Sequence, residues 1–262
     1  MPYYGDLLAQ LPTTSHRKTN RDIGSGTFSP GTDESVSGDW SATLEEWRSE
    51  ISRAQSPASV PQPDVSGQRS RGFKSNALGA MSSLVPLSVQ NQIVDRVLIQ
   101  VSVYLTDKQI RNDILARSAS AFSEAASIAE ACGEPLIIAA HSLGTVVALE
   151  ALADFTGREV DLLMTIGSPL STETVASRMT RGARRWPMMV RNWVNVSDPN
   201  DLVALHHSVD RRNFLRNCAD RDPAGVCNIG DIVNHMDNHH GIAGYLDDPV
   251  VAQILTSVSQ IL

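Results

Sequence analysis

The residues best placed for chemistry lie where an apolar run, 136–140, leads directly into a helical pattern. Ser142 lies at this junction, and the residues two positions before and after it, Ala140 and Gly144, are small. A serine in a sharp strand-to-helix turn has a strained backbone, and larger side chains at these two positions would collide. The turn would also leave the hydroxyl above the sheet at a helix N-terminus, whose free N–H groups favour a developing oxyanion. The pattern predicts a nucleophilic serine, with the N–H of Leu143 as one oxyanion donor; the alternative is a serine that only caps the helix.

A nucleophilic serine needs a general base, and the base needs a carboxylate to orient it. Two acids, Asp198 and Asp201, follow the apolar run 190–196. The histidines that come after them are His206, His207, His235, His239 and His240. The group at 235–240 follows the last predicted strand and precedes the predicted C-terminal helix. That position favours this group as the source of the base.

Several of these segments resemble the α/β-hydrolase family. The run Ala140-His-Ser-Leu-Gly144 resembles its nucleophile elbow, G-x-S-x-G, in a form common among lipases and esterases. Here alanine replaces the first glycine, a change that the geometry of the turn tolerates. The run 161–170 (Asp-Leu-Leu-Met-Thr-Ile-Gly-Ser-Pro-Leu) and the run 193–204 are also similar to bacterial lipase-like members.

The resemblance implies a role for particular residues. A D-x-V pattern in the acid turn of these hydrolases falls on Asp201, with Asp198 as the alternative acid. The segment from His240 to Tyr245-Leu resembles their histidine loop, so His240 is the implied base and His239 the alternative. We also expect two residues adjacent to these motifs, His141 and Ser168, to bind substrate.

The first third of the chain departs from the family pattern. Members usually begin with an apolar strand and a His-Gly pair that supplies the second oxyanion N–H, and this chain has no such segment. Tyr3-Tyr4-Gly5-Asp6 resembles a strand that comes after that motif, so the chain is expected to lack the family's first strand. Gly5 and Ser168 are candidates for the second donor. The resemblance covers about 130–260 and is poor over 1–105.

A metal site is an alternative for the histidine group. His235, Asp237, His239 and His240 bring imidazoles and a carboxylate close together in sequence, and such side chains bind zinc. No second ligand cluster accompanies them, and a metal would leave the turn at Ser142 unexplained. We therefore expect neither a metal nor a cofactor.

Helical and strand patterns supply the elements that must position these residues. The spacing of Leu44, Trp47 and Ile51 predicts a helix over 40–54, and apolar residues at helical spacing predict another over 88–105. Thr106 to Gln109 fits a capping box that opens a third helix, which Gly133 ends. Helices are also predicted over 143–154 and 171–181, and from an Asp248 cap with Pro249 at the first position. The apolar part of 77–105 either packs in the core or forms a pair of cap helices.

Short apolar runs alternate with helices beyond residue 134. The runs are 136–140, 161–166, 190–196 and 226–233, and such alternation predicts a parallel sheet covered on both faces. We therefore predict a single α/β domain over 1–262 of the α/β-hydrolase type, with a mostly parallel sheet. Its parts are long polar loops at 13–39 and 56–72, a helical insertion over 73–132 before the nucleophile turn, and a catalytic core over 134–262.

Composition excludes several classes of protein. The chain has 262 residues and a net charge of −7, which argues against nucleic acid as the main partner. No apolar run approaches the roughly 20 residues of a membrane span, and the start lacks the pattern of a secretory signal. The three cysteines include Cys218 and Cys227, which would pair only in an oxidising compartment. We expect free thiols and a cytoplasmic protein.

These observations lead to one functional expectation with two alternatives. We expect a serine hydrolase that cleaves a carboxylic ester, of a small molecule or a lipid, through an acyl-enzyme on Ser142. The same triad would serve a thioesterase, an acyltransferase or a peptidase. The missing His-Gly segment favours a different alternative, a hydrolase scaffold that binds a partner without catalysis.

Overall fold

The structure is a computed structural model that describes residues 40–54, 87–180, 183–215 and 225–258. The predicted loops at 13–39 and 56–72, the segment with Gly5, and Cys218 lie outside the described residues. So do residues 77–86 of the apolar stretch.

Within the described residues, four parallel strands form one sheet in the order β1-β2-β3-β4. Their bounds are β1 (Ile137–His141), β2 (Leu162–Ile166), β3 (Trp193–Val196) and β4 (Cys227–Ile229). The prediction of an α/β fold with a parallel sheet is therefore confirmed. Because all four strands run the same way, the segments that follow them emerge at one edge of the sheet.

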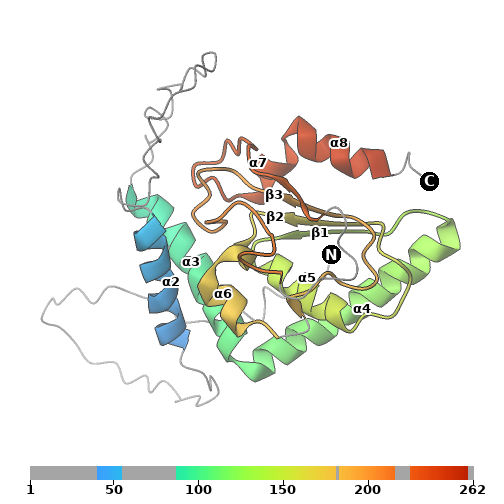
Figure 1. Cartoon of the computed structure of the whole chain (residues 1–262), viewed down its shortest axis with the longest axis horizontal. Coiled ribbons are helices and arrows are strands. Elements are labelled where there is room, and N and C mark those ends of the chain that lie inside the picture. Colours follow the sequence, from blue (N-terminus) through green and yellow to red (C-terminus); the bar gives the residue numbers. More distant parts are fainter. Residues whose placement is uncertain (1–39, 55–86, 181–182, 216–224, 259–262) are drawn as a thin grey trace, which may run out of the picture.

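The apolar side chains of β2, which is buried along its whole length, alternate between the two faces of the sheet. In β2, Leu163 packs into the larger core cluster, while Leu162, Met164 and Ile166 pack into the second. Helices cover the two faces from opposite sides (Figure 1). A strand buried on both faces reads as a continuous apolar run, which is why the period-two signal is absent from the sequence.

The helices divide between these faces. Those on the larger cluster's side are α2 (Trp40–Ala54), α3 (Leu87–Thr106), α4 (Lys108–Cys132), α5 (Leu143–Ala153) and α6 (Glu173–Arg178). Two helices, α7 (Ile242–Leu246) and α8 (Pro249–Ser257), pack on the second cluster. Between 94 and 105, α3 contributes seven buried apolar side chains to the larger core, so the described part of the apolar stretch packs in the core.

The helix ends at Gly133 and Asp248 follow the predicted capping signals, but the capping box predicted from Thr106 does not form, because Thr106 is the last residue of α3 and Asp107 is the N-cap of α4. The carboxylate of Asp107 accepts hydrogen bonds from the N–H groups of Gln109 and Ile110 at the start of α4. The same helix ends at Gly133, whose φ of 68° is the left-handed conformation that favours glycine. Asp248 caps α8, with Pro249 at its first position. Each such cap contributes about 1 kcal/mol to helix stability.

Some elements differ from the prediction. The helix expected over 171–181 is a 3-10 turn (Pro169–Ser171) followed by α6, because Thr172 between them is extended (ψ 140°). The runs 190–196 and 226–233 form strands only at Trp193–Val196 and Cys227–Ile229. The short helix α7 was not predicted, because glycines at 241 and 244 suppress its helix propensity.

A buried carboxylate on α5 joins the helices of the larger core. Glu150 accepts hydrogen bonds from the Tyr104 hydroxyl (2.6 Å), from Nε of Arg111 (2.9 Å) and from the N–H of Thr180 (3.1 Å). These partners lie on α3, on α4 and just after α6. The cluster therefore fixes the helix that begins directly after Ser142.

The composition also led to predictions about membrane-spanning helices and about the cysteines. No described helix has both the length and the apolar character that crossing a bilayer requires. Cys132 and Cys227 are exposed free thiols.

Candidate active site

The candidate residues lie in the segments that follow the strands at the carboxyl edge of the sheet. Ser142 follows β1, Gly167 and Ser168 follow β2, and Asp198 and Asp201 follow β3. The segment that follows β4 carries the histidines at 235–240. Parallel strands thus bring together residues that lie about 100 positions apart in the chain.

Ser142 lies in the turn between β1 and α5 with a backbone conformation that is rare for a non-glycine residue, φ 54° and ψ −129°. Such a conformation costs about 1–3 kcal/mol and persists only where the surroundings hold it. Here its N–H donates to the carbonyl of Ile166 (3.0 Å), and its carbonyl accepts from the hydroxyl of Thr145 (2.7 Å). The serine side chain makes no capping hydrogen bond to α5. Its hydroxyl therefore has another partner.

That partner is His240. Nε2 of His240 lies 2.8 Å from Oγ of Ser142, and Nδ1 lies 2.8 Å from Oδ2 and 3.0 Å from Oδ1 of Asp201. All three side chains are buried. A carboxylate only accepts, so Nδ1 carries the proton and Nε2 is the acceptor for the serine hydroxyl. This arrangement suits proton removal from the serine.

The surroundings of Asp201 keep its carboxylate ionised. Burial opposes the charge, but hydrogen bonds from His240, Tyr245 and the N–H of Val203 outweigh burial and lower the pKa of Asp201. The Tyr245 hydroxyl donates to Oδ2 (2.7 Å), and the Val203 N–H donates to Oδ1 (2.9 Å). An ionised carboxylate at this position both orients the imidazole and stabilises its protonated form.

Asp198, the alternative acid, has a different set of partners. Its Oδ1 accepts from the N–H of Asn200 (2.6 Å), and its Oδ2 accepts from the N–H of Asn234 (2.7 Å). Asn234 lies in the segment that leads to the histidines. Asp198 therefore fastens that segment to the turn after β3 and does not contact His240 through its carboxylate.

The other candidate histidines lie away from Ser142. Nδ1 of His239 donates to the carbonyl of Asn234 (3.1 Å) and lies 3.4 Å from Oδ2 of Asp198. His235 is exposed and lies 3.5 Å from the carboxylate of Asp247. Only His240 among the histidines at 235–240 faces the serine hydroxyl in the described contacts.

Ser168 and Leu143 supply different hydrogen-bonding groups beside the serine. Because the Thr145 hydroxyl donates to Ser142, the Ser168 hydroxyl is the donor in its 2.8 Å contact with Oγ1 of Thr145. The hydroxyl proton of Ser168 is therefore engaged within the protein. Leu143 is the first residue of α5, so its N–H has no acceptor within the helix. The other candidate donor, Gly5, lies outside the described residues.

Gly167 lets the acid and base pack against the backbone of the turn after β2. Its φ of 51° favours glycine, and a Cβ added there would lie 2.9 Å from Oδ2 of Asp201 and 3.1 Å from Cε2 of Tyr245. Sequence reasoning did not indicate these contacts of Gly167 and Tyr245, although both residues occur in segments that resemble hydrolase motifs. Their roles depend on contacts between segments that follow different strands.

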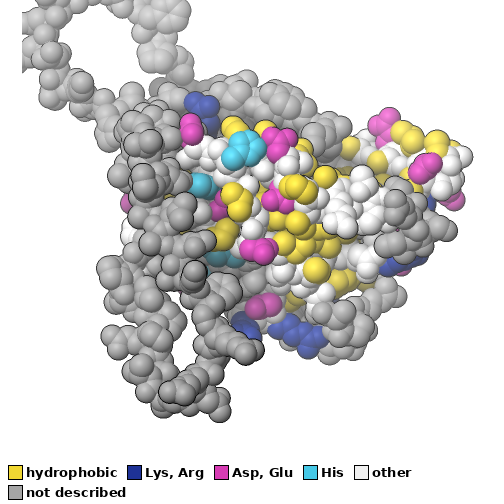
Figure 2. All heavy atoms as spheres, turned by 90° about the horizontal axis from the view of Figure 1, so that it is seen from above, with side chains coloured by type: hydrophobic (Ala, Val, Ile, Leu, Met, Phe, Trp, Pro, Cys, Tyr) yellow, Lys and Arg dark blue, Asp and Glu magenta, His cyan; other side chains and the backbone are white. Residues whose placement is uncertain are grey.

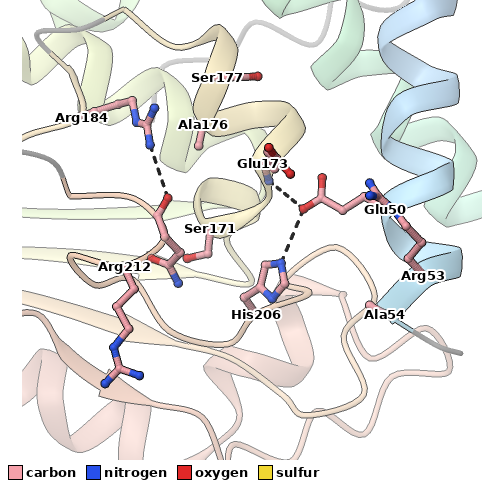
Figure 3. Close-up of a pocket in the computed structure, with 11 residues that line it drawn as sticks. Glu50, Arg53, Ala54, Ser171, Glu173, Ala176, Ser177, Arg184, His206 and Arg212 are labelled. Atoms are coloured by element: carbon pink, nitrogen blue, oxygen red, sulfur yellow. Dashed lines mark hydrogen bonds and ion pairs between the residues drawn. The ribbon is translucent and has the colours of Figure 1, made fainter. Parts of the chain in front are cut away.

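A cavity of about 560 Å³ lies between α2, α6 and the segment 206–213. Its lining includes Glu50, Arg53, Glu173, Arg184 and His206 but not the three residues of the Ser142 site. Glu50 extends from α2 toward the start of α6, where it accepts from the N–H of Glu173 (2.7 Å), and toward His206 (3.5 Å) (Figure 3). The cavity is lined by groups that join α2 to the rest of the molecule.

Apolar side chains are exposed on the segments around His240. They include Val233, Met236 and Leu246, and Val250 follows in α8. Seen from the side of α8, hydrophobic side chains gather next to histidine and acidic side chains on this face (Figure 2). The face near the site is thus mixed, with an apolar part and an acidic part.

The alternative prediction for the histidines at 235–240 was a metal site. Among the described residues, no three or more His, Cys, Asp or Glu side chains are arranged to hold a metal ion.

In comparisons with known proteins, the chain matches no family model, no curated protein and no solved structure.

Proposed function

We propose that this protein is a serine hydrolase of the α/β-hydrolase type that cleaves a carboxylic ester through an acyl-enzyme on Ser142. The observation that carries the proposal is the continuous contact from Oγ of Ser142 to Nε2 of His240 (2.8 Å) and from Nδ1 to Oδ2 of Asp201 (2.8 Å). The strained backbone of Ser142 (φ 54°) supports it, because strain of this kind is concentrated at functional sites.

The first half of the reaction would form the acyl-enzyme. Oγ of Ser142 attacks the ester carbonyl carbon while Nε2 of His240 takes the serine proton. Asp201 holds the imidazole through Nδ1–H and stabilises the imidazolium that forms. The carbonyl oxygen becomes an oxyanion, and the free N–H of Leu143 at the start of α5 is positioned to stabilise it. The tetrahedral intermediate then collapses, the ester C–O bond breaks, and His240 gives its proton to the oxygen of the leaving alcohol.

The second half would release the acid. Water takes the place of the alcohol, gives a proton to Nε2 of His240 and attacks the acyl carbon. Collapse of the second tetrahedral intermediate returns the proton to Oγ of Ser142 and frees the carboxylic acid. Every proton passes between Ser142, His240, water and the substrate, so these steps need no group beyond the side chains described.

The surface near the site supports an ester with an apolar part. Val233 and Met236 are exposed in the segment that leads to His240, where burial of an apolar group would be favourable. The acidic side chains Asp231 and Asp237 in the same segment would disfavour an anionic group. We therefore infer an uncharged, partly apolar ester.

A fluorophosphonate probe tests the proposal directly. The probe should label the wild-type chain, and Ser142→Ala should abolish both labelling and hydrolysis of p-nitrophenyl butyrate. Ser123→Ala is the matched control, because Ser123 is an exposed serine on α4 whose hydroxyl donates to the carbonyl of Ala119 (3.0 Å). This variant should label like the wild type.

The outcomes separate the alternatives. A folded wild type that neither labels nor hydrolyses esters overturns the proposal and favours the non-catalytic scaffold. Labelling at Ser142 with faster turnover of thioesters or amides than of esters keeps the acyl-enzyme and changes the substrate class to that of a thioesterase or a peptidase.

A further inference from the structure

The His141 ring contacts both the backbone carbonyl and the ring of His240, the residue proposed as the base. Nε2 of His141 lies 2.7 Å from the carbonyl oxygen of His240, and the two ring centroids are 4.7 Å apart with an interplanar angle of 35°. Since a carbonyl oxygen only accepts, Nε2 of His141 carries the proton. The side chain next to Ser142 in sequence is thus directed at His240.

The His141 ring is neutral at pH 7. Burial, together with the nearby His240, lowers the pKa of His141 to about 4. A neutral ring offers a π-face that attracts a cation. It therefore does not oppose the imidazolium that would form when His240 takes the serine proton.

The segment that carries His240 depends on side-chain hydrogen bonds for its conformation. It belongs to no strand or helix, and the preceding residue, His239, has φ 52°, a strained value for a non-glycine residue. The N–H of His240 donates to Oδ1 of Asn238 (3.2 Å), and the carbonyl is held by His141. The two peptide groups of His240 are therefore anchored by two different side chains.

We infer that His141 is a positioning residue: it holds the carbonyl of His240 so that the imidazole stays within proton-transfer distance of Ser142. The catalytic role of His141 rests on the proposed function, whereas its role in fixing His240 rests only on the hydrogen bond from its Nε2 to the His240 carbonyl. This inference differs from the expectation that His141 binds substrate. It requires no contact between His141 and the reacting atoms.

Two substitutions separate the hydrogen bond from the ring contact. His141→Phe keeps an aromatic ring beside His240 and loses the donor, whereas His141→Gln places an amide N–H near the position of Nε2 and loses the ring. With p-nitrophenyl butyrate, we expect His141→Phe to lower kcat about tenfold with little change in KM, the rate equivalent of one hydrogen bond. His141→Gln should recover most of the lost rate.

A spectroscopic measurement provides the readout that does not depend on activity. The proton shared by Nδ1 of His240 and Asp201 should give a resolved NMR resonance in the wild type and in His141→Gln. In His141→Phe the resonance should broaden or disappear, because the imidazole is no longer held. His235→Gln is the control, since His235 is an exposed histidine of the same segment; it should change neither the rate nor the resonance.

The inference is overturned if His141→Phe keeps the wild-type kcat and resonance, or if His141→Gln loses as much of both as His141→Phe does. Failure of the proposed function gives a different result: no variant and no wild type would hydrolyse the ester or take the probe. In that case the resonance of His240 in the two variants still decides whether His141 positions it.

Discussion

The hydroxyl of Tyr245 donates a hydrogen bond of 2.7 Å to Oδ2 of Asp201, the carboxylate oxygen that also lies 2.8 Å from Nδ1 of His240. The same hydroxyl accepts from the N–H of Asp198 (3.0 Å). Tyr245 therefore connects the turn after β3 to α7, which follows His240. Burial and the charge of Asp201 raise the pKa of Tyr245, so the phenol stays protonated and remains a donor.

Tyr245→Phe should change the pH dependence of hydrolysis. Loss of a donor to the ionised form raises the pKa of Asp201. A more basic carboxylate binds the protonated imidazole more strongly, so the acid limb of kcat/KM, which belongs to the Asp201–His240 pair, should move to higher pH. The rate at the optimum should fall by about three- to tenfold. A pH profile from 4 to 9 measures both effects.

Tyr104→Phe is the matched control for this substitution. Tyr104 is also fully buried, and its hydroxyl also donates to a carboxylate, that of Glu150 (2.6 Å). Tyr104→Phe should lose about 1–2 kcal/mol of unfolding free energy with its hydrogen bond to a carboxylate, and Tyr245→Phe should lose somewhat more, because it removes the bond to Asp201 and the acceptor of the Asp198 N–H. An equal shift of the acid limb in both variants would show that the effect comes from general destabilisation and not from Asp201.

Asp201→Asn and Asp198→Asn should have unequal effects on hydrolysis. Asparagine at 201 cannot hold the imidazole in the required tautomer, and the corresponding change in serine triads costs about 10⁴ in kcat. Asparagine at 198 keeps one acceptor oxygen, so only one of the two N–H groups, that of Asn200 or that of Asn234, loses its acceptor, and we expect no more than about a tenfold loss. Steady-state kinetics of the two purified variants measure the difference. Similar mild losses would contradict the assignment of Asp201.

Gly167→Ala should lower both stability and activity. The added methyl group would lie 2.9 Å from Oδ2 of Asp201, and the backbone has φ 51°. Asp201 or the backbone must move, which displaces the carboxylate from His240. We expect a loss of about 2–4 kcal/mol in unfolding free energy, since strain and overpacking add, and a fall of at least about tenfold in kcat.

Gly133→Ala isolates the backbone part of that effect. Gly133 has a similar φ of 68°, but a Cβ added there has no atom within 4 Å. This variant should lose about 1 kcal/mol, the cost of the left-handed conformation, and should keep its activity. Thermal denaturation and ester hydrolysis of the two alanine variants give the comparison. Equal losses of stability in the two variants would contradict the close contact at Gly167.

Local sequence patterns predict some parts of this arrangement, and other parts depend on contacts that no local pattern contains. The turn at Ser142 was predictable because the small residues at 140 and 144 and the change from strand to helix all lie within one short segment. The caps at Gly133 and Asp248 are local in the same way. The contacts of Tyr245 with Asp198 and Asp201 span more than 40 positions, so periodicity and spacing cannot indicate them.

The choice between the two acids shows where sequence reasoning reaches its limit. Asp198 and Asp201 follow the same strand three residues apart, and both are buried and hydrogen-bonded. Residue types near β3 favour Asp201 only through the D-x-V pattern of the family resemblance. What distinguishes them is the second partner: the N–H of Asn234 for Asp198, and the imidazole of His240 for Asp201. Both partners come from the segment after β4, so only the folded arrangement separates the two roles.

Glu50 should make the stability of the protein depend on acidic pH. Burial opposes its charge, but hydrogen bonds from His206, from the N–H groups of Glu173 and Thr174 and from the Thr174 hydroxyl lower the pKa of Glu50 from 4.5 to about 2. A carboxylate whose pKa is lowered by folding stabilises the folded state above its unfolded pKa. That stability is lost as the pH falls from about 4.5 toward 2 and is worth on the order of 3 kcal/mol at neutral pH.

Urea denaturation should therefore show a gap in unfolding free energy between wild type and Glu50→Gln at pH 7, and this gap should narrow progressively at pH 4 and pH 3. Glu46→Gln on the same helix is the control, because Glu46 is an exposed partner of Arg178 and should change the free energy by less than about 1 kcal/mol at either pH. A gap for Glu50→Gln that is as large at pH 3 as at pH 7 would show that folding leaves the pKa of Glu50 unchanged, contrary to the contacts with α6.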